Sequence, residues 1–112
     1  MIKKNKGMKD KIEKTIELAK NIALAISEGD EVERFRSRLV KITDKYEQPF
    51  ADVFLTFEKA KPSYFTVLIH EQTLSRAVED EEDAVEEICG LLSSIQDSNS
   101  DITMTYLGEE ED

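Results

Sequence analysis

Two runs of alternating apolar residues, separated by a short turn, constrain the fold of this chain more than any other feature. Residues 53–57 alternate between large apolar and other side chains, and residues 65–69 repeat the pattern after Ala60-Lys61-Pro62. A period of two is typical of a β-strand with one buried face. A three-residue loop predicts an antiparallel hairpin that gathers six apolar side chains on one face. The predicted pairs are Phe57 with Phe65, Leu55 with Val67 and Val53 with Ile69.

Apolar residues at helical spacing flank this hairpin on both sides. Residues 9–27 and 82–95 each carry apolar side chains at steps of three and four, which is the spacing of one helix face. The first stripe comprises Ile12, Ile16, Ala19, Ala23 and Ile26, and the second comprises Ala84, Val85, Ile88, Leu91, Leu92 and Ile95. After the polar segment 97–100, Ile102, Met104 and Tyr106 alternate with threonines, which predicts a final strand.

Residues 32–50 fit two kinds of secondary structure. The apolar positions Val32, Phe35, Leu39, Ile42 and Tyr46 follow a helix seam at every step, whereas strict alternation fails. A capping box at residues 30–33, just after the helix-ending residue 29, also favours a helix start. The β-branched residues in 40–43 favour a strand instead. We expect a helix that ends before residue 49, a proline, with the strand as the alternative.

Together these elements predict an α+β fold. Its order is two N-terminal helices, a β-hairpin, a helix and a final strand, giving a small antiparallel or mixed three-stranded sheet packed on helices. We expect one domain over residues 9–108, a flexible basic tail over 1–8 and a flexible acidic tail over 109–112. The second sheet face would expose Phe54, Tyr64 and Leu68, which suggests helix cover or a homodimer contact.

Charge is distributed very unevenly along the chain. Residues 1–70 carry 14 Lys and Arg against 11 Asp and Glu, a net charge of +3. Residues 71–112 carry one Arg against 14 acids, a net charge of −13. Such asymmetry bears on partners and on rates of association rather than on the fold.

The acidic run is the first candidate functional surface. Seven carboxylates fall within nine residues: Glu79, Asp80, Glu81, Glu82, Asp83, Glu86 and Glu87. Acids in a first helical turn each stabilise the helix dipole by about 0.3 to 1 kcal/mol, which accounts for two or three of them. The surplus predicts a docking surface for a partner with a basic surface, in the manner of an inhibitor, an adaptor or a small chaperone. Carboxylates along a helix could also mimic a nucleic-acid backbone, whereas a solvated face is the simpler interpretation.

A basic stripe is the second candidate surface. Arg34, Arg38, Lys41 and Lys45 follow at steps of four, three and four, so they share one side of a helix. On a strand, Arg34, Arg36 and Arg38 would still share one face. The alternative function is therefore a nucleic-acid-associated protein, although the acidic segment would oppose phosphate binding.

Catalytic, metal and cofactor motifs are absent from the sequence. His70 is the one histidine and is expected to be a solvated residue at a strand end, while Cys89 is expected to be a buried inert thiol on its helix. The acidic run lacks the central glycine of a calcium loop. We therefore expect a non-enzymatic protein without a cofactor or metal. A single cysteine and the lack of an apolar run of about 20 residues predict a cytoplasmic location.

Overall fold

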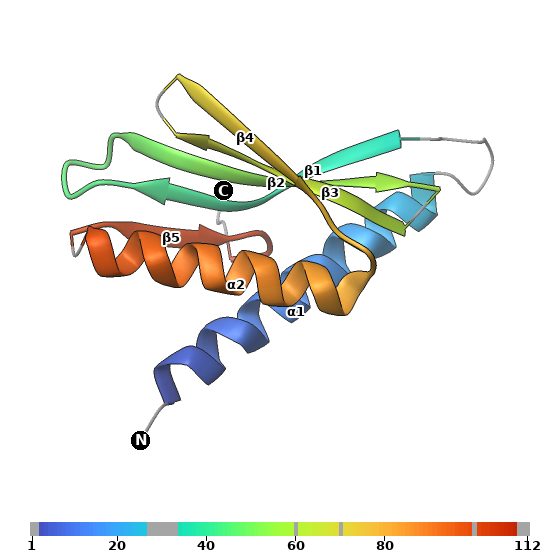
Figure 1. The fold of residues 1–112 in the computed structure, drawn as a ribbon, viewed down its shortest axis with the longest axis horizontal. Helices are drawn as coiled ribbons and strands as arrows, with labels where there is room; N and C mark the ends of the chain where they lie inside the picture. The colour runs from blue at the N-terminus through green and yellow to red at the C-terminus, as the bar shows by residue number, and fades with distance from the viewer. Residues whose placement is uncertain (1–2, 27–33, 60, 70, 100, 110–112) are drawn as a thin grey trace.

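The computed structural model describes residues 3–26, 34–59, 61–69, 71–99 and 101–109. They form two helices and five strands in an α+β arrangement (Figure 1). In chain order the elements are α1 (Lys3–Ile26), β1 (Arg34–Thr43), β2 (Pro49–Glu58), β3 (Lys61–Ile69), β4 (Gln72–Ala77), α2 (Glu81–Ser98) and β5 (Thr103–Tyr106).

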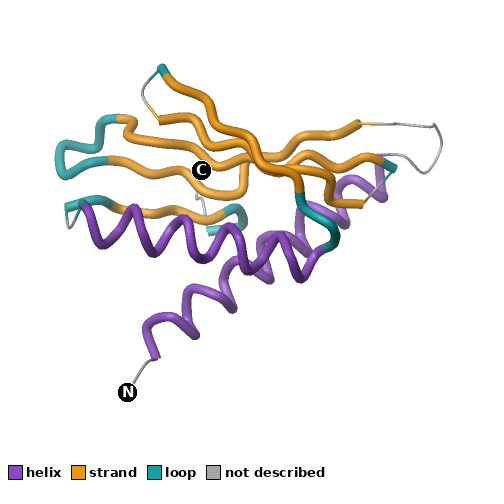
Figure 2. The backbone as a smooth tube through the Cα atoms, in the orientation of Figure 1, coloured by secondary structure: helices purple, strands orange, loops and turns teal. Residues whose placement is uncertain are grey.

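The strands form one antiparallel sheet in the order β4-β3-β2-β1-β5. Both helices lie on the same side of this sheet and cross each other beneath it (Figures 1 and 2). In the part of the chain that the structure describes, no helix covers the opposite face. The fold therefore has two layers, with one sheet face buried and the other open.

The core lies between the helices and the covered sheet face. Ile12 and Ile16 from α1 and Ile88 and Leu92 from α2 are fully buried against the strands. Burial confirms the predicted stripes at Ile12, Ile16, Ala19 and Ala23 of α1 and at Ala84, Val85, Ile88, Leu92 and Ile95 of α2, while Leu91 is partly buried. The side chain of Ile26 lies outside the described part of the structure. The β5 strand, which pairs with β1, confirms the predicted final strand. Burial on this scale supplies most of the folding free energy, at roughly 25 cal/mol per Å² of apolar surface. Of the predicted inward face of the hairpin, five residues are buried and Ile69 is partly buried; the five are Val53, Leu55, Phe57, Phe65 and Val67.

The prediction of a second helix over residues 32–50 is wrong, and the strand alternative holds for residues 34–43. The reason is a β-bulge between Arg38 and Val40, which inserts one extra residue into β1. Leu39 and Val40 are consequently both buried, and the Leu39 carbonyl accepts a hydrogen bond of 2.8 Å from the Leu107 amide. The extra residue breaks the alternation and imitates helical spacing. The predicted capping box at 30–33 lies outside the described residues.

The predicted three-stranded sheet is also wrong, because β1 and β4 bring the number of strands to five. All six residues of β4 are exposed, and Leu74 is the one large apolar side chain among them. An edge strand that no helix covers needs no buried face, so it leaves no alternating pattern in the sequence.

The predicted hairpin register is shifted by two residues. Leu55 pairs with Phe65 and Val53 pairs with Val67, while Phe57 pairs with Pro62. The turn is tighter than expected because Glu58 pairs directly with Lys61, and Lys59 adopts a positive φ of 55° in the turn. A shift of two residues preserves the face of every side chain, so the predicted inward set is unchanged.

The ends of the chain differ from the predicted boundaries in one respect. α1 begins at Lys3, within the segment expected to be a tail. At the other end, Glu109 forms a turn after β5, and residues 110–112 lie outside the described residues.

Candidate partner-binding surfaces

Two carboxylates of the acidic run cap the start of α2. Asp80 is the N-cap residue, and its carboxylate accepts a hydrogen bond of 2.8 Å from the Asp83 amide. The Asp83 carboxylate in turn accepts one of 2.9 Å from the Glu79 amide. These bonds satisfy amides that a helix start leaves without intrahelical partners. Asp80 and Asp83 therefore have a structural role that accounts for their presence.

Two further members of the run form ion pairs. Glu81 lies 2.9 Å from the Lys20 ammonium of α1, and Glu87 lies 3.0 Å from the Arg76 guanidinium of β4. The hydrogen bond from Lys20 to Glu81 and their opposite charges raise the pKa of the Lys20 ammonium. These contacts link α2 to both of its neighbours, α1 on one side and β4 on the other.

Glu79, Glu82 and Glu86 remain as the exposed acids of the run, and no ion pair joins them to the described residues. A shallow hollow between the helices is lined by Glu82 together with Glu13 and Glu17 of α1. Glu13 and Glu17 were not among the predicted site residues, although their spacing of four along α1 is visible in the sequence. We call Glu13, Glu17, Glu79, Glu82 and Glu86 the acidic surface.

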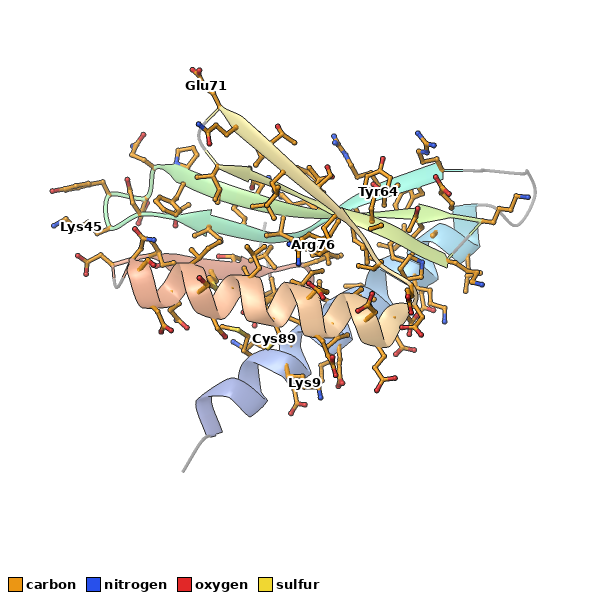
Figure 3. All side chains as sticks on the ribbon, in the orientation of Figure 1. Lys9, Lys45, Tyr64, Glu71, Arg76 and Cys89 are labelled. Carbon is orange, nitrogen blue, oxygen red and sulfur yellow. The ribbon has the colours of Figure 1, made fainter. Side chains whose placement is uncertain are left out.

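The basic stripe lies on the open face of the sheet. Arg34 and Arg38 point to that face because they pair with Glu58 and Phe54 of β2, opposite the buried side chains. Lys41 pairs with Asp52 on the same face. Lys45 instead lies in the turn after β1, with its ammonium 5.3 Å from the centre of the Tyr46 ring (Figure 3). Three of the four predicted residues are thus brought together on a strand rather than on a helix.

Much of this basic charge has local partners. Arg34 lies 3.1 Å from Glu58, Arg38 lies 3.6 Å from Asp52, and the Arg36 guanidinium stacks 4.5 Å above the centre of the Phe54 ring. Exposed ion pairs of this kind contribute about 0 to 1 kcal/mol each. They nevertheless lower the positive potential that the open face presents.

The open face also carries two aromatic rings. Phe54 and Tyr64 are half-buried. Phe54 lies two residues before Thr56 on β2, and Tyr64 is the register partner of Thr56 on β3. The Thr56 hydroxyl is buried and finds no hydrogen-bond partner among the described residues. Proteins that bind single-stranded nucleic acids combine aromatic rings, on which the bases stack, with basic side chains that contact the phosphates.

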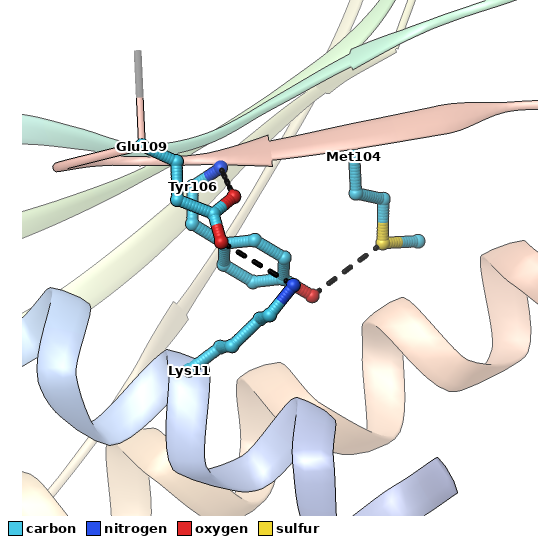
Figure 4. A network of polar contacts seen from close by, with 4 residues as sticks. All are labelled: Lys11, Met104, Tyr106 and Glu109. Atoms are coloured by element: carbon cyan, nitrogen blue, oxygen red, sulfur yellow. Dashed lines mark hydrogen bonds and ion pairs between the residues drawn. The ribbon is translucent and has the colours of Figure 1, made fainter.

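A polar network connects α1 to β5, at one edge of the sheet (Figure 4). The Tyr106 amide donates a hydrogen bond of 3.2 Å to Glu109, whose other carboxylate oxygen lies 3.3 Å from the Lys11 ammonium. That ammonium lies 5.4 Å from the centre of the Tyr106 ring. Burial, with Glu109 nearby, raises the pKa of Tyr106 to about 12. The network joins α1 to β5.

The residues considered for chemistry are not brought together. Cys89 is half-buried against the core rather than fully buried, and His70 lies outside the described residues. Within the described ranges, no three His, Cys, Asp or Glu side chains gather in a way that could hold a metal ion. None of the helices described is long and apolar enough to cross a membrane.

No protein-family model, curated protein or solved structure matches this chain. A functional proposal must therefore rest on the geometry and charge of the surfaces described above.

Proposed function

We propose that this protein is a binding module that docks a partner protein with a basic surface through its acidic surface. The proposal is supported by the acids that neither cap α2 nor form an ion pair with a described residue. Asp80 and Asp83 cap α2, and Glu81 and Glu87 pair with basic residues. Of the acids that remain, Glu13 and Glu17 of α1 and Glu82 of α2 line one hollow, together with Lys9. Glu86 lines a separate groove between α2 and β4.

The physical basis is electrostatic steering. A surface of one sign attracts an oppositely charged partner and can raise the association rate by one or more orders of magnitude. The net charge of −10 adds to this field at long range. Binding of this kind weakens with salt, because exposed charges are screened over about 10 Å at 0.1 M ionic strength. An inhibitor, an adaptor or a chaperone-like protein could use such a surface, and a partner that normally binds nucleic acid would meet it as a mimic of the phosphate backbone.

The test compares two variants that change the net charge equally. One neutralises exposed acids of the acidic surface and the other neutralises acids elsewhere: Glu79→Gln, Glu82→Gln and Glu86→Gln against Glu47→Gln, Asp97→Asn and Asp101→Asn. Affinity capture from a lysate of the cells of origin is carried out at low and high salt. A basic protein retained by the wild type and by the second variant, but lost by the first, supports the proposal. Equal capture by both variants would overturn it.

A second candidate is binding of single-stranded nucleic acid on the open sheet face. The observation that favours it is the position of Phe54 and Tyr64 beside Arg36, Arg38 and Lys41 on adjacent strands. Base stacking on such rings contributes about 1 to 3 kcal/mol per base. The local ion pairs and the acidic segment oppose it, which is why it ranks second.

Fluorescence polarisation with a labelled single-stranded oligonucleotide separates the two candidates. Neutralising Arg36 and Lys41, for which no ion pair is found among the described residues, should reduce nucleic-acid binding and leave capture of a basic protein intact. A wild type that does not bind the oligonucleotide, while it still captures a basic protein, would favour the acidic surface. Binding that is unchanged in both assays would point away from the open face.

A further inference from the structure

The two edge strands of the sheet, β4 and β5, differ in how well they are protected against pairing with another chain. β5 is only four residues long, and the outward amide of Tyr106 is covered by the Glu109 carboxylate. β4 is six residues long, pairs with β3 without a bulge, and contains no proline. Natural proteins usually block exposed edges with bulges, prolines, charges or short strands, because open edges pair with other chains. The β4 strand carries one charged residue, Arg76, and no other described strand pairs with its outer edge.

The hydrogen-bond pattern identifies which backbone groups of β4 face outward. The Val78 amide donates a bond of 2.9 Å to the Ser63 carbonyl, just beyond the β3–β4 ladder. Bonded and non-bonded pairs alternate along an antiparallel ladder, so Arg76 and Leu74 also direct their amides and carbonyls toward β3. Thr73, Ser75 and Ala77 then direct theirs to the open edge. The outward amides and carbonyls of these three residues are available to pair with a short added strand.

A groove runs beside this edge, between β4 and α2. It has a volume of about 450 Å³ and is lined by Phe65, Leu74 and Arg76 from the sheet and by Glu86, Gly90 and Leu91 from the helix. Leu74 is 57% exposed, although it points toward the helix layer. Apart from its chain neighbours and its own helix backbone, a Cβ atom at Gly90 would meet no atom within 4 Å, so the space beside it is open. The groove is apolar near Leu74 and Leu91. Its charged end holds Glu86 together with Arg76 and Glu87, which pair with each other at 3.0 Å.

We propose that an extended peptide adds to β4 as a sixth strand and directs alternate side chains into this groove. The inference rests on the proposed function, since it names the form in which a basic partner would bind. Strand addition supplies main-chain hydrogen bonds, and pockets beside the edge select alternate side chains. Here the groove takes apolar side chains at its Leu74 end and one lysine or arginine at its Glu86 end. Glu86 carries no ion pair to a described residue and is free to meet that cation.

Charge decides between a peptide and a second copy of the chain. Pairing two β4 edges would bring together two molecules that each carry a net charge of −10. A basic extended peptide has the complementary charge.

The probe is an end-blocked, fluorescent heptapeptide with threonine at its odd positions and lysine, valine and valine at its even positions. In the antiparallel direction of every other pair in this sheet, the threonine amides face β4 and the even side chains enter the groove. N-methylation of the threonine amides should abolish binding, whereas N-methylation of the even amides should change the affinity by less than about twofold. Glutamate in place of lysine should weaken binding about tenfold or more.

Protein variants test the same geometry. Ser75→Pro removes an outward amide and keeps the bonds to β3, and proline is tolerated in an edge strand at such a position. It should lower peptide affinity at least about tenfold, whereas Ser75→Ala, which also removes the hydroxyl bonded to Thr66, should change it by less than about twofold. Gly90→Leu places an apolar side chain in the open space beside Gly90 and should also lower affinity at least about tenfold. Circular dichroism verifies that each variant is folded.

Three results would overturn strand addition: no saturable binding, tolerance of both N-methylated peptides, or unchanged affinity in Ser75→Pro. A dimer seen by sedimentation that Ser75→Pro dissociates would also overturn it, since the edge would then pair with itself. Capture of a lysate partner separates this inference from the proposed function. Loss of the partner in the Glu79, Glu82 and Glu86 variant but not in Ser75→Pro would preserve acidic docking and reject the sixth strand.

Discussion

Replacing Gly90 with alanine should stabilise the protein. Gly90 lies in the middle of α2 and is exposed, and an added Cβ would meet no atom within 4 Å. The substitution therefore creates no clash, and it removes backbone freedom that the unfolded chain would otherwise gain. Glycine inside a helix is less favourable than alanine by about 0.5 to 1 kcal/mol. We expect an increase of that size in the free energy of unfolding.

The free energy of unfolding is measured by urea unfolding, followed by circular dichroism. The comparison requires that its slope against urea concentration is the same in the two proteins. At roughly 4 °C per kcal/mol for a domain of this size, Tm should rise by about 2 to 4 °C. Gly108→Ala is the matched control, because Gly108 has a φ of 96° and its Cβ would lie 3.1 Å from a Leu18 methyl. That variant should lose stability. A Gly90→Ala protein with unchanged or reduced stability would refute the reasoning that the groove is open at this point.

Three further predictions concern stability. Asp80→Ala removes the N-cap of α2 and should cost about 1 kcal/mol in urea unfolding, whereas Asp80→Asn should cost less. Phe57→Ala should cost about 3 to 5 kcal/mol, a large part of total stability, because the ring is fully buried; a loss below about 1 kcal/mol would contradict its central place in the core. Tyr106 has a pKa of about 12 in the folded protein and about 10 when unfolded, so the unfolded state loses its proton first and stability falls as pH rises from about 10 to 12. Urea unfolding across that range should show a smaller fall in Tyr106→Phe than in the wild type.

The candidate surfaces could be recognised from sequence only in part. The seven acids of residues 79–87 form an obvious run, but their division into caps, ion pairs and exposed acids depends on what faces them. Glu81 pairs with Lys20 of α1, which is far away in the sequence. Glu87 pairs with Arg76 of β4, which lies across the turn before α2. Sequence spacing carries no information on such partners, because they meet only when the elements pack.

The sequence determined the elements whose side chains are sorted by burial. α1, α2 and the hairpin each bury one face, so their apolar residues recur at the period of a helix or a strand. The inward set of the hairpin survived even a register error of two residues, since that shift preserves every face.

Tertiary structure alone decided β1, β4 and the groove beside β4. In β1 the bulge before Val40 disrupts the alternation. Its extra residue, Leu39, has no register partner in β2; its side chain is buried in the core, and its carbonyl accepts a hydrogen bond from the chain after β5. In β4 no side chain is buried, so its strand conformation comes from backbone hydrogen bonds to β3 rather than from any apolar pattern. Hydrogen bonds between distant backbone segments depend on the partner strand and not on local side chains, which is why the open edge and its groove become visible only in the folded chain.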